Sequence, residues 1–347
     1  AELANKMISR STRLARGPAQ ARVAAQIPRR RAPMLSGRLP YQHEFHAGNF
    51  ADVMKHTVLL LLLQRMGDKE SPFTYVETHA GAGSYNFESA ATKQLNEQAG
   101  GIERLLALAD GAEAGGLESL PAHAQTLVEM SRGRTYPGSP KIAAEQLRPQ
   151  DSLLLCELAP EPHAQLSGCA PIDALIAQGR ARVLCADGYK AVRVRDTDGD
   201  GDAPPPAQRK RSPKRPKPQA RPRALVLIDP PYQMGGDTER IVQLVEYLAR
   251  HWRSARVAIW LPLRDDGRAE RMYQQLAALD VPGGILAAEL VGAESADGRL
   301  AGSGMVLVQP HYGIKEELEA LLSALGECLR RPGAEAAQAR LHWIVEA

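Results

Sequence analysis

Four apolar runs in this chain each end in a carboxylate beside glycine or proline, and this repeated arrangement constrains the fold most. The four acids are Glu77, Glu157, Asp187 and Asp229. Short apolar runs bounded by turn residues are typical of buried strands, and open α/β sheets bind ligands outside the carboxyl ends of their strands. The pattern therefore predicts an α/β fold in which one edge of a sheet collects all four acids.

The first of these runs leads into a glycine turn, His79-Ala-Gly81-Ala-Gly83. Glycines after a strand let a ligand approach the backbone closely, often at a helix N-terminus. A dinucleotide-binding motif would place a third glycine at Asn86, so an NAD site is disfavoured. Glu157, at the end of the next run, is the type of group that accepts hydrogen bonds from ribose hydroxyls.

The fourth run ends in Asp229-Pro230-Pro231-Tyr232, which combines an acid, a stiff turn and an aromatic ring. Two successive prolines fix φ and carry no N–H, so their carbonyls stay free as acceptors. The exocyclic amine of a base offers two N–H donors, which suit Asp229 and the Pro230 carbonyl, and Tyr232 offers a ring for stacking. A strand that ends this way resembles motif IV of amino-methyltransferases.

The chain as a whole resembles the bacterial 23S ribosomal RNA (adenine-N6)-methyltransferase J family. The resemblance runs from about Met34 to the C-terminus. It is carried by an ordered set of motifs, Tyr41-Gln-His43-Glu-Phe-His46 continuing to Lys55-His56, Thr78-His79-Ala-Gly-Ala-Gly, Tyr136-Pro-Gly-Ser139-Pro, Cys156-Glu157-Leu, Ala186-Asp187-Gly188, Ile228-Asp-Pro-Pro-Tyr232 and Gly302-Ser-Gly-Met.

The resemblance implies a class I methyltransferase fold, Rossmann-like, with a seven-stranded and mostly parallel sheet that binds S-adenosylmethionine. It implies Asp229 as the active-site acid and a 23S ribosomal RNA adenine as substrate. The residues that it places at the cofactor are His56, His79, Ser139, Glu157, Asp187, Gly188 and Asp229. Those expected at the RNA substrate are Tyr41, His43, Lys55, Pro230, Pro231 and Tyr232.

Two other functions are compatible with some of these features. A DNA adenine-N6 methyltransferase would share Asp229-Pro-Pro-Tyr and the cofactor motifs, but it would usually need a larger recognition region than this chain offers. A non-catalytic RNA-binding protein on the same fold would explain the basic segments, but the intact motif at Asp229 argues against lost activity.

Composition indicates a globular protein of the cytoplasm. The 347 residues are 44% hydrophobic, enough for a sizeable core, and no apolar stretch is long enough to span a membrane. Val58 to Leu63 is expected to be a buried helix face. The four cysteines lack the spacing of a zinc site and are expected to be reduced, buried thiols, and no metal is expected. Nothing in the strands requires a partner, so a monomer is expected.

The domain organisation expected is a disordered basic extension over residues 1–33 and one methyltransferase domain over 34–347. Leu and Ala at helical spacing predict a helical insertion over 86–134. High Pro and charge content predicts a disordered loop over 196–223. The alternating Asp and Gly that open this loop hint at a calcium site, but no glutamate follows at the required position.

Elements expected after Tyr232 alternate between helix and strand. They are a helix near Thr238–Trp252, a strand Val257–Trp260, a helix near Arg268–Leu279, strands at Ile285–Val291 and Met305–Gln309, and an amphipathic stretch Ile314–Cys328.

Charge is unevenly distributed along the chain. Residues 1–33 hold eight Lys or Arg against one acid, a net charge of +7, and residues 196–223 hold eight against four, a net charge of +4. Because the whole chain carries only +3, the remaining core carries −8. Contact with RNA must then be local, near Tyr41 and Lys55, or come from the two basic segments.

Overall fold

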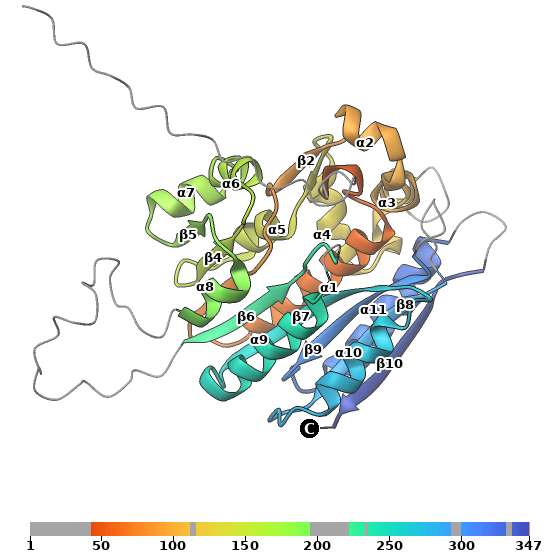
Figure 1. The fold of residues 1–347 in the computed structure, drawn as a ribbon. Coiled ribbons are helices and arrows are strands. Elements are labelled where there is room, and N and C mark those ends of the chain that lie inside the picture. The colour runs from red at the N-terminus through yellow and green to blue at the C-terminus, as the bar shows by residue number, and fades with distance from the viewer. Residues whose placement is uncertain are drawn as a thin grey trace, which may run out of the picture. The chain divides into compact units, whose positions relative to one another are not determined.

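An eight-stranded mixed sheet lies at the centre of this computed structural model, which describes residues 43–111, 116–194, 222–232, 235–292, 300–330 and 335–346 (Figure 1). The strand order is β10-β8-β9-β7-β6-β1-β4-β5. The bounds are β1 Phe73–Glu77, β4 Ser152–Cys156, β5 Ala181–Leu184, β6 Arg223–Ile228, β7 Ala255–Leu263, β8 Ile285–Val291, β9 Gly302–Val308 and β10 Gln338–Val345.

The five strands from β7 to β5 run parallel, whereas β9, β8 and β10 join by antiparallel pairing. The predicted α/β sheet is present, with one strand more than the seven expected. The additional strand is β10, which pairs with β8 and forms one edge of the sheet. The other seven strands all lie where the sequence placed apolar runs.

Helices cover both faces of this sheet (Figure 1). One face packs against α1, α5, α6, α7 and α11, and the other against α8, α9 and α10. The helix bounds are α1 Phe50–Gly67, α2 Ala90–Leu95, α3 Ile102–Ala109, α4 Ala122–Ser131, α5 Ser139–Gln146, α6 Pro160–Ser167, α7 Ile172–Ala177, α8 Gly188–Val194, α9 Asp237–His251, α10 Arg268–Ala277 and α11 Ile314–Cys328. The predicted helices after Tyr232 agree with α9, α10 and α11 to within two residues at each end.

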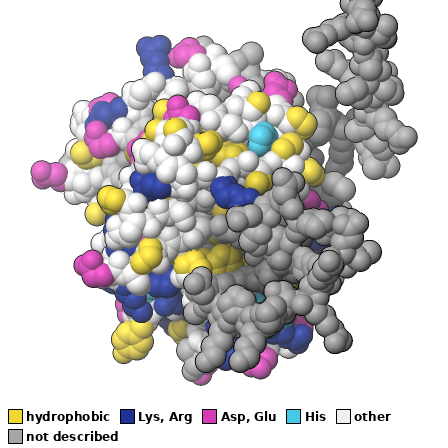
Figure 2. Space-filling view, turned by 90° about the vertical axis from the view of Figure 1, so that its left-hand side faces the viewer, with side chains coloured by type: hydrophobic (Ala, Val, Ile, Leu, Met, Phe, Trp, Pro, Cys, Tyr) yellow, Lys and Arg dark blue, Asp and Glu magenta, His cyan; other side chains and the backbone are white. Residues whose placement is uncertain are grey.

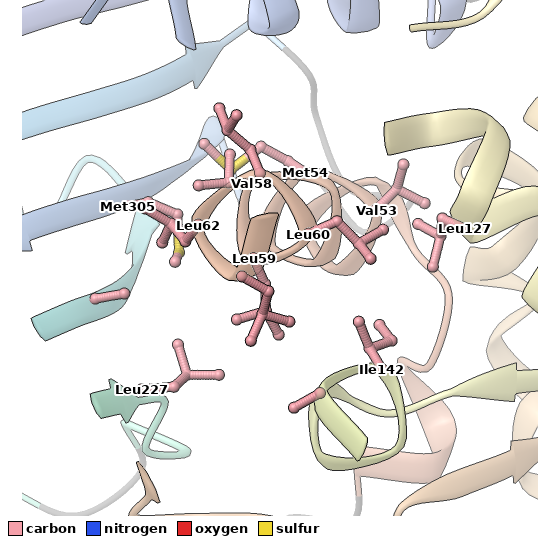
Figure 3. Packing of buried hydrophobic residues seen from close by; sticks show 14 of the residues in the cluster. Val53, Met54, Val58, Leu59, Leu60, Leu62, Leu127, Ile142, Leu227 and Met305 are labelled. Carbon is pink, nitrogen blue, oxygen red and sulfur yellow. The ribbon is translucent and has the colours of Figure 1, made fainter. Parts of the chain in front are cut away.

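Helix α1 is buried on every side rather than along one face. Its first turn is capped by the side chain of Asn49, which accepts a hydrogen bond from the backbone N–H of Asp52 at 2.9 Å. Figure 3 shows its apolar side chains pointing in several directions, toward Met305 of β9, Leu227 of β6 and Ile142 of α5. A helix that is apolar all round is expected only where other elements surround it.

The helices of the predicted insertion lie between β2, Ser84–Asn86, and β3, Thr135–Pro137, which pair with each other as a separate antiparallel ladder. Between these strands come α2, α3 and α4 with short 3-10 turns at Glu97–Gly100 and Leu117–Ser119. Helix α4 contacts α1. The helical character of this segment agrees with the prediction from Leu and Ala spacing.

The predictions on the basic segments, the cysteines and membrane spans can be compared with the described residues. Residues 1–33 and most of the predicted loop 196–223 lie outside them, but Arg223, the last residue of that loop, is instead the first residue of β6. All four cysteines are free, but the prediction of buried thiols holds only for Cys156. Cys169 and Cys328 are partly exposed, and Cys185 is exposed because it follows β5 rather than lying within it. None of the helices described has the length and apolar character needed to cross a bilayer.

Candidate active site

The four strand-end acids meet at the carboxyl edge of the parallel strands. Glu77 is the last residue of β1, and Glu157, Asp187 and Asp229 come shortly after the ends of β4, β5 and β6. These strands are neighbours in the order β6-β1-β4-β5 and run in the same direction. The structure therefore brings together the four acids that the sequence singled out.

The glycine turn after β1 forms a tight cradle beside Glu157. Gly81 and Gly83 have positive φ values of 62° and 83°, a conformation that favours glycine. A Cβ atom at Gly81 would lie 2.4 Å from the hydroxyl of Tyr85, which occupies the space beside this glycine. Glu157 accepts hydrogen bonds from the backbone N–H groups of Gly81, at 2.9 Å, and Ala159, at 2.7 Å. Its carboxylate thus fixes the turn.

Asp187 and Gly188 bring the end of β5 against the end of β1. A Cβ atom at Gly188 would lie 2.1 Å from the carbonyl oxygen of Thr78, so the two backbones touch. Asp187 accepts one hydrogen bond from the backbone N–H of Tyr189 at 3.1 Å and pairs with Arg240 at 2.5 Å. The guanidinium of Arg240 also lies 4.2 Å from the centre of the Tyr189 ring.

Glu77 is fully buried and is hydrogen-bonded by two hydroxyls. Ser139, the first residue of α5, donates to one carboxyl oxygen at 2.6 Å, and Tyr75 donates to the other at 2.9 Å. Burial raises the pKa of Glu77 to about 8, although the two hydrogen bonds act in the opposite direction and Asp229 adds to the rise. Glu77 is therefore mostly protonated at neutral pH.

His56 lies in the buried middle of α1 with one nitrogen engaged. Its Nδ1 lies 2.8 Å from the hydroxyl of Tyr136, and either group can donate the hydrogen of this bond. The other ring nitrogen, Nε2, is buried and has no hydrogen-bond partner among the described residues. Burial also lowers the pKa of His56 well below its ordinary value, so the ring is neutral.

His79 lies in the glycine turn between the ends of β1 and β5. Its Nδ1 is 2.8 Å from the hydroxyl of Thr78, and its ring meets the edge of Tyr189 at 4.9 Å between ring centres. Burial lowers the pKa of His79 to about 4, so this ring is neutral too. Two neutral imidazoles thus lie at the predicted cofactor site.

A line of alternating charges leads from the N-terminal motif to Asp229. Lys55 Nζ lies 2.7 Å from Asp229 Oδ2 and 2.8 Å from Asp52 Oδ1, and His43 Nε2 lies 3.0 Å from Asp52 Oδ2. Burial opposes the charge of Lys55, which is 3% exposed, but Asp229 and Asp52 outweigh burial and raise its pKa. Burial likewise acts against ionised Asp52, but His43 and Lys55 lower its pKa well below the ordinary value.

The Asp-Pro-Pro-Tyr turn follows β6 directly. Pro230 is buried and Pro231 exposed, and Tyr232 has a positive φ of 53°, which is rare for an aromatic residue. The Tyr232 hydroxyl donates to the carbonyl of Trp260 at 2.6 Å, and the guanidinium of Arg268 lies 5.3 Å from its ring centre. The ring is buried between these neighbours, so it does not present the open stacking face expected from the sequence.

The residues at this edge fit S-adenosylmethionine. The buried Nε2 of His56 has no partner among the described residues, so a polar group of a ligand can satisfy it. Glu157 and Asp187 each follow a parallel strand, where ribose and adenine groups are bound in such folds. No arrangement of three or more metal-binding side chains occurs in the described part of the chain.

Sequence reasoning missed three side chains that complete the site, Asp52, Arg240 and Trp260. Trp260 of β7 supports both Lys55, whose Nζ lies 5.7 Å from its ring centre, and Tyr232. A weak signal for Asp52 was present, since a carboxylate three residues before Lys55 lies on the same helix face. Of the predicted site residues, Tyr41 lies outside the described part of the chain.

Comparison with known proteins identifies the chain. A family model described as ribosomal RNA large subunit methyltransferase D, RlmJ, matches residues 70–203 and 207–345. The ribosomal RNA large subunit methyltransferases J of Escherichia coli (strain K12) and Haemophilus influenzae (strain ATCC 51907 / DSM 11121 / KW20 / Rd) are each 32% identical to it. The alignments cover 88% and 84% of this chain and 99% and 94% of those proteins.

A solved structure supports the fold independently. The crystal structure of protein LPL1258 from Legionella pneumophila superimposes with a TM-score of 0.66 at 24% identity and covers 86% of this chain and 98% of that one. The mixed α/β sheet is thus a Rossmann-like methyltransferase fold, as the sequence predicted. The family model and the two relatives show that the chain belongs to the ribosomal RNA large subunit methyltransferase family RlmJ.

Proposed function

We propose that this protein transfers a methyl group from S-adenosylmethionine to the N6 amine of an adenine in 23S ribosomal RNA. The observation that carries the proposal is the position of Asp229, at the end of β6 and next to the neighbouring strand ends of β1, β4 and β5. Its Oδ2 is held by Lys55 at 2.7 Å, while its Oδ1 has no hydrogen bond among the described residues. That free oxygen can accept an N–H from an amine.

The adenine amine is a poor nucleophile, so the active site has to make its lone pair available. S-Adenosylmethionine supplies a methyl group activated by its sulfonium. The amine lone pair is delocalised into the ring, and hydrogen bonds from the amine to Asp229 and the Pro230 carbonyl would favour a pyramidal nitrogen whose lone pair points at the methyl carbon. Orientation of this kind contributes about 7–11 kcal/mol to lowering a barrier.

Lys55 keeps the Asp229 carboxylate in place while positive charge develops on the amine. Because the pKa of Lys55 is raised, its ammonium stays charged throughout the neutral range. Its second partner, Asp52, ties the pair to η1, His43–Phe45, through His43. Asp229 either accepts the leaving proton or stabilises the methylated cation until water removes the proton.

RNA is favoured over DNA as substrate by the family and by the size of the insertion. The curated relatives are named as methyltransferases of large-subunit ribosomal RNA. Among the described residues, the insertion between β2 and β3 consists of the short helices α2, α3 and α4 and two 3-10 turns. We propose further that the protein acts as a monomer in the cytoplasm, with 23S ribosomal RNA as its partner.

A methyl-transfer assay with three substrates tests the proposal. Tritiated S-adenosylmethionine is incubated with protein-free 23S ribosomal RNA, assembled large subunits and DNA, and the labelled nucleoside is identified after digestion. We expect N6-methyladenosine from at least one RNA substrate. Asp229→Asn, which keeps the side-chain shape, should lower the single-turnover rate roughly 100- to 1,000-fold.

Two outcomes would contradict the proposal. Equal or better labelling of DNA would overturn the RNA assignment. Transfer that survives in Asp229→Asn at the wild-type rate would remove Asp229 from the mechanism. The matched control is Asp266→Asn, an exposed carboxylate before α10, which should retain wild-type transfer.

A further inference from the structure

Two arginines and a histidine converge at the opposite end of the sheet, where the parallel strands begin. Leu225 of β6 pairs with Arg256 of β7, so their side chains lie on the same face of the sheet. Arg223, two residues before Leu225, shares that face. Arg256 donates to the carbonyl of Gln309 at 2.6 Å, which places it beside the turn that carries His311.

Neither arginine of this group forms an ion pair with a carboxylate of the described residues. Within the described residues, Arg256 donates only to the Gln309 carbonyl, and Arg223 donates to the carbonyls of Met66 and Ser71 at 2.8 and 2.9 Å and to the Ser71 hydroxyl at 3.2 Å. Both side chains are half-buried. Burial lowers the pKa of each, with a further contribution from a neighbouring arginine. Buried charges in proteins are normally paired.

His311 adds two unused polar atoms to this group. Both ring nitrogens are buried and have no hydrogen-bond partner among the described residues. Burial together with Arg256, Arg223 and Arg65 lowers the pKa of His311 to about 3, so the ring is neutral and keeps one N–H to donate. Among the described residues, Asp151 and Asp68 act on this group only at longer range, and neither arginine pairs with a carboxylate. Two such cations and a free N–H donor form an environment that an anion would stabilise.

We propose that Arg223, Arg256 and His311 form an anion site for a phosphate group of the RNA backbone, remote from the methyl-transfer site. The choice of an RNA phosphate rests on the proposed function. Guanidinium groups match the geometry of phosphate oxygens. All three residues are partly exposed, and Figure 2 shows several Lys and Arg side chains low on the face of the molecule that it draws.

Two further features suit an extended RNA. Tyr312, next to His311, is fully exposed and can lie against a base or ribose. The six residues of β6 separate the anion site from Asp229 by about 20 Å at roughly 3.3 Å per residue, a distance that a folded RNA element can span. The site thereby gives an acidic core a second basic contact with its substrate.

The test measures binding of a 23S ribosomal RNA fragment that the wild-type protein methylates, as a function of salt concentration. Arg256→Gln should weaken RNA binding roughly tenfold at low salt and reduce the slope of log K against log salt by about 0.7 to 0.9. Arg256→Lys keeps the charge and should retain most of the slope. Arg330→Gln, an exposed arginine after α11, removes the same charge elsewhere and should change neither quantity.

A second variant and a second ligand distinguish the loss of an RNA contact from a folding defect. His311→Gln should weaken RNA binding while the melting temperature and the affinity for S-adenosylmethionine stay at wild-type values. Inorganic phosphate should raise the melting temperature of the wild-type protein more than that of Arg256→Gln. This measurement needs no RNA, so it stays informative even if no RNA is methylated.

Three results would overturn the inference. Unchanged RNA affinity and salt slope in both Arg256→Gln and His311→Gln would exclude an RNA contact. If phosphate still stabilises only the wild-type protein in that case, the site takes free phosphate and not the RNA backbone. Equal stabilisation of both proteins by phosphate would remove the anion site altogether.

Discussion

Glu77 is expected to make the protein less stable as the pH rises through neutrality. Its pKa is 4.5 in an exposed chain and about 8 in the folded protein, chiefly because of burial. Between these values the folded state binds more protons than the unfolded state, so the free energy of unfolding falls with rising pH. The full shift corresponds to about 5 kcal/mol, at about 1.4 kcal/mol per pH unit.

Histidines oppose Glu77 near neutral pH. His56, His79 and His311 have lowered pKa values, so the unfolded state binds more protons at these residues and they raise stability as the pH rises through about 6.5. Between about pH 6.5 and 8, the contribution of Glu77 to the free energy of unfolding should fall by about 2 kcal/mol, and comparison with a variant that lacks the carboxyl separates it from the histidines. Ser139 and Tyr75 do not titrate in this range and leave the slope unchanged.

Urea unfolding of the wild-type protein and Glu77→Gln across this range measures the effect. The glutamine has no charge to lose, so its profile should be flatter by about 2 kcal/mol over the window. Asp229→Asn removes a charge that helps to raise the pKa of Glu77 and should give an intermediate slope. Parallel profiles for all three proteins would refute the reasoning.

Three other perturbations test separate parts of the structure. Lys55→Met leaves the buried Asp52 and the partly buried Asp229 without their shared cation and should cost about 3–5 kcal/mol by chemical denaturation. The double variant with Asp229→Asn should restore part of the loss; no restoration would contradict the ion pair. Gly188→Ala forces a Cβ against the Thr78 backbone and should cost about 1–3 kcal/mol and weaken S-adenosylmethionine binding in calorimetry, whereas unchanged affinity would argue against this contact as part of the site. Deletion of residues 196–221 should weaken RNA binding and flatten its salt dependence without changing cofactor affinity; unaltered RNA affinity across salt would exclude a role for this segment.

The sheet was largely predictable because its parallel strands are short apolar runs that end in turn residues. The missed strand, β10, carries a usable signal, since Leu341 and Trp343 alternate with Arg340 and His342. This period-two pattern begins only after the helical spacing that ends at Cys328.

Prediction of the site was limited by distance along the chain. The positions of Glu77 and Asp229 followed from strand ends, which share one edge in any parallel sheet. The bond between Lys55 and Asp229 joins residues 174 positions apart and depends on how α1 lies across the sheet. The buried state of the Tyr232 ring depends on Trp260 and Arg268, which come from later elements. Such contacts are set by packing, which local patterns do not encode.

The burial of α1 on every side has a consequence for how the active site moves. Backbone amides in an element packed on all sides exchange with solvent only when the whole domain opens. Lys55 and His56 belong to that element, so the groups proposed to hold the acid and the cofactor should belong to the slowest-exchanging part of the protein. Changes that adapt the protein to a new RNA would then occur in the surrounding turns and in the insertion. The residues of α1 that support the reaction would stay in place, because this helix unfolds last.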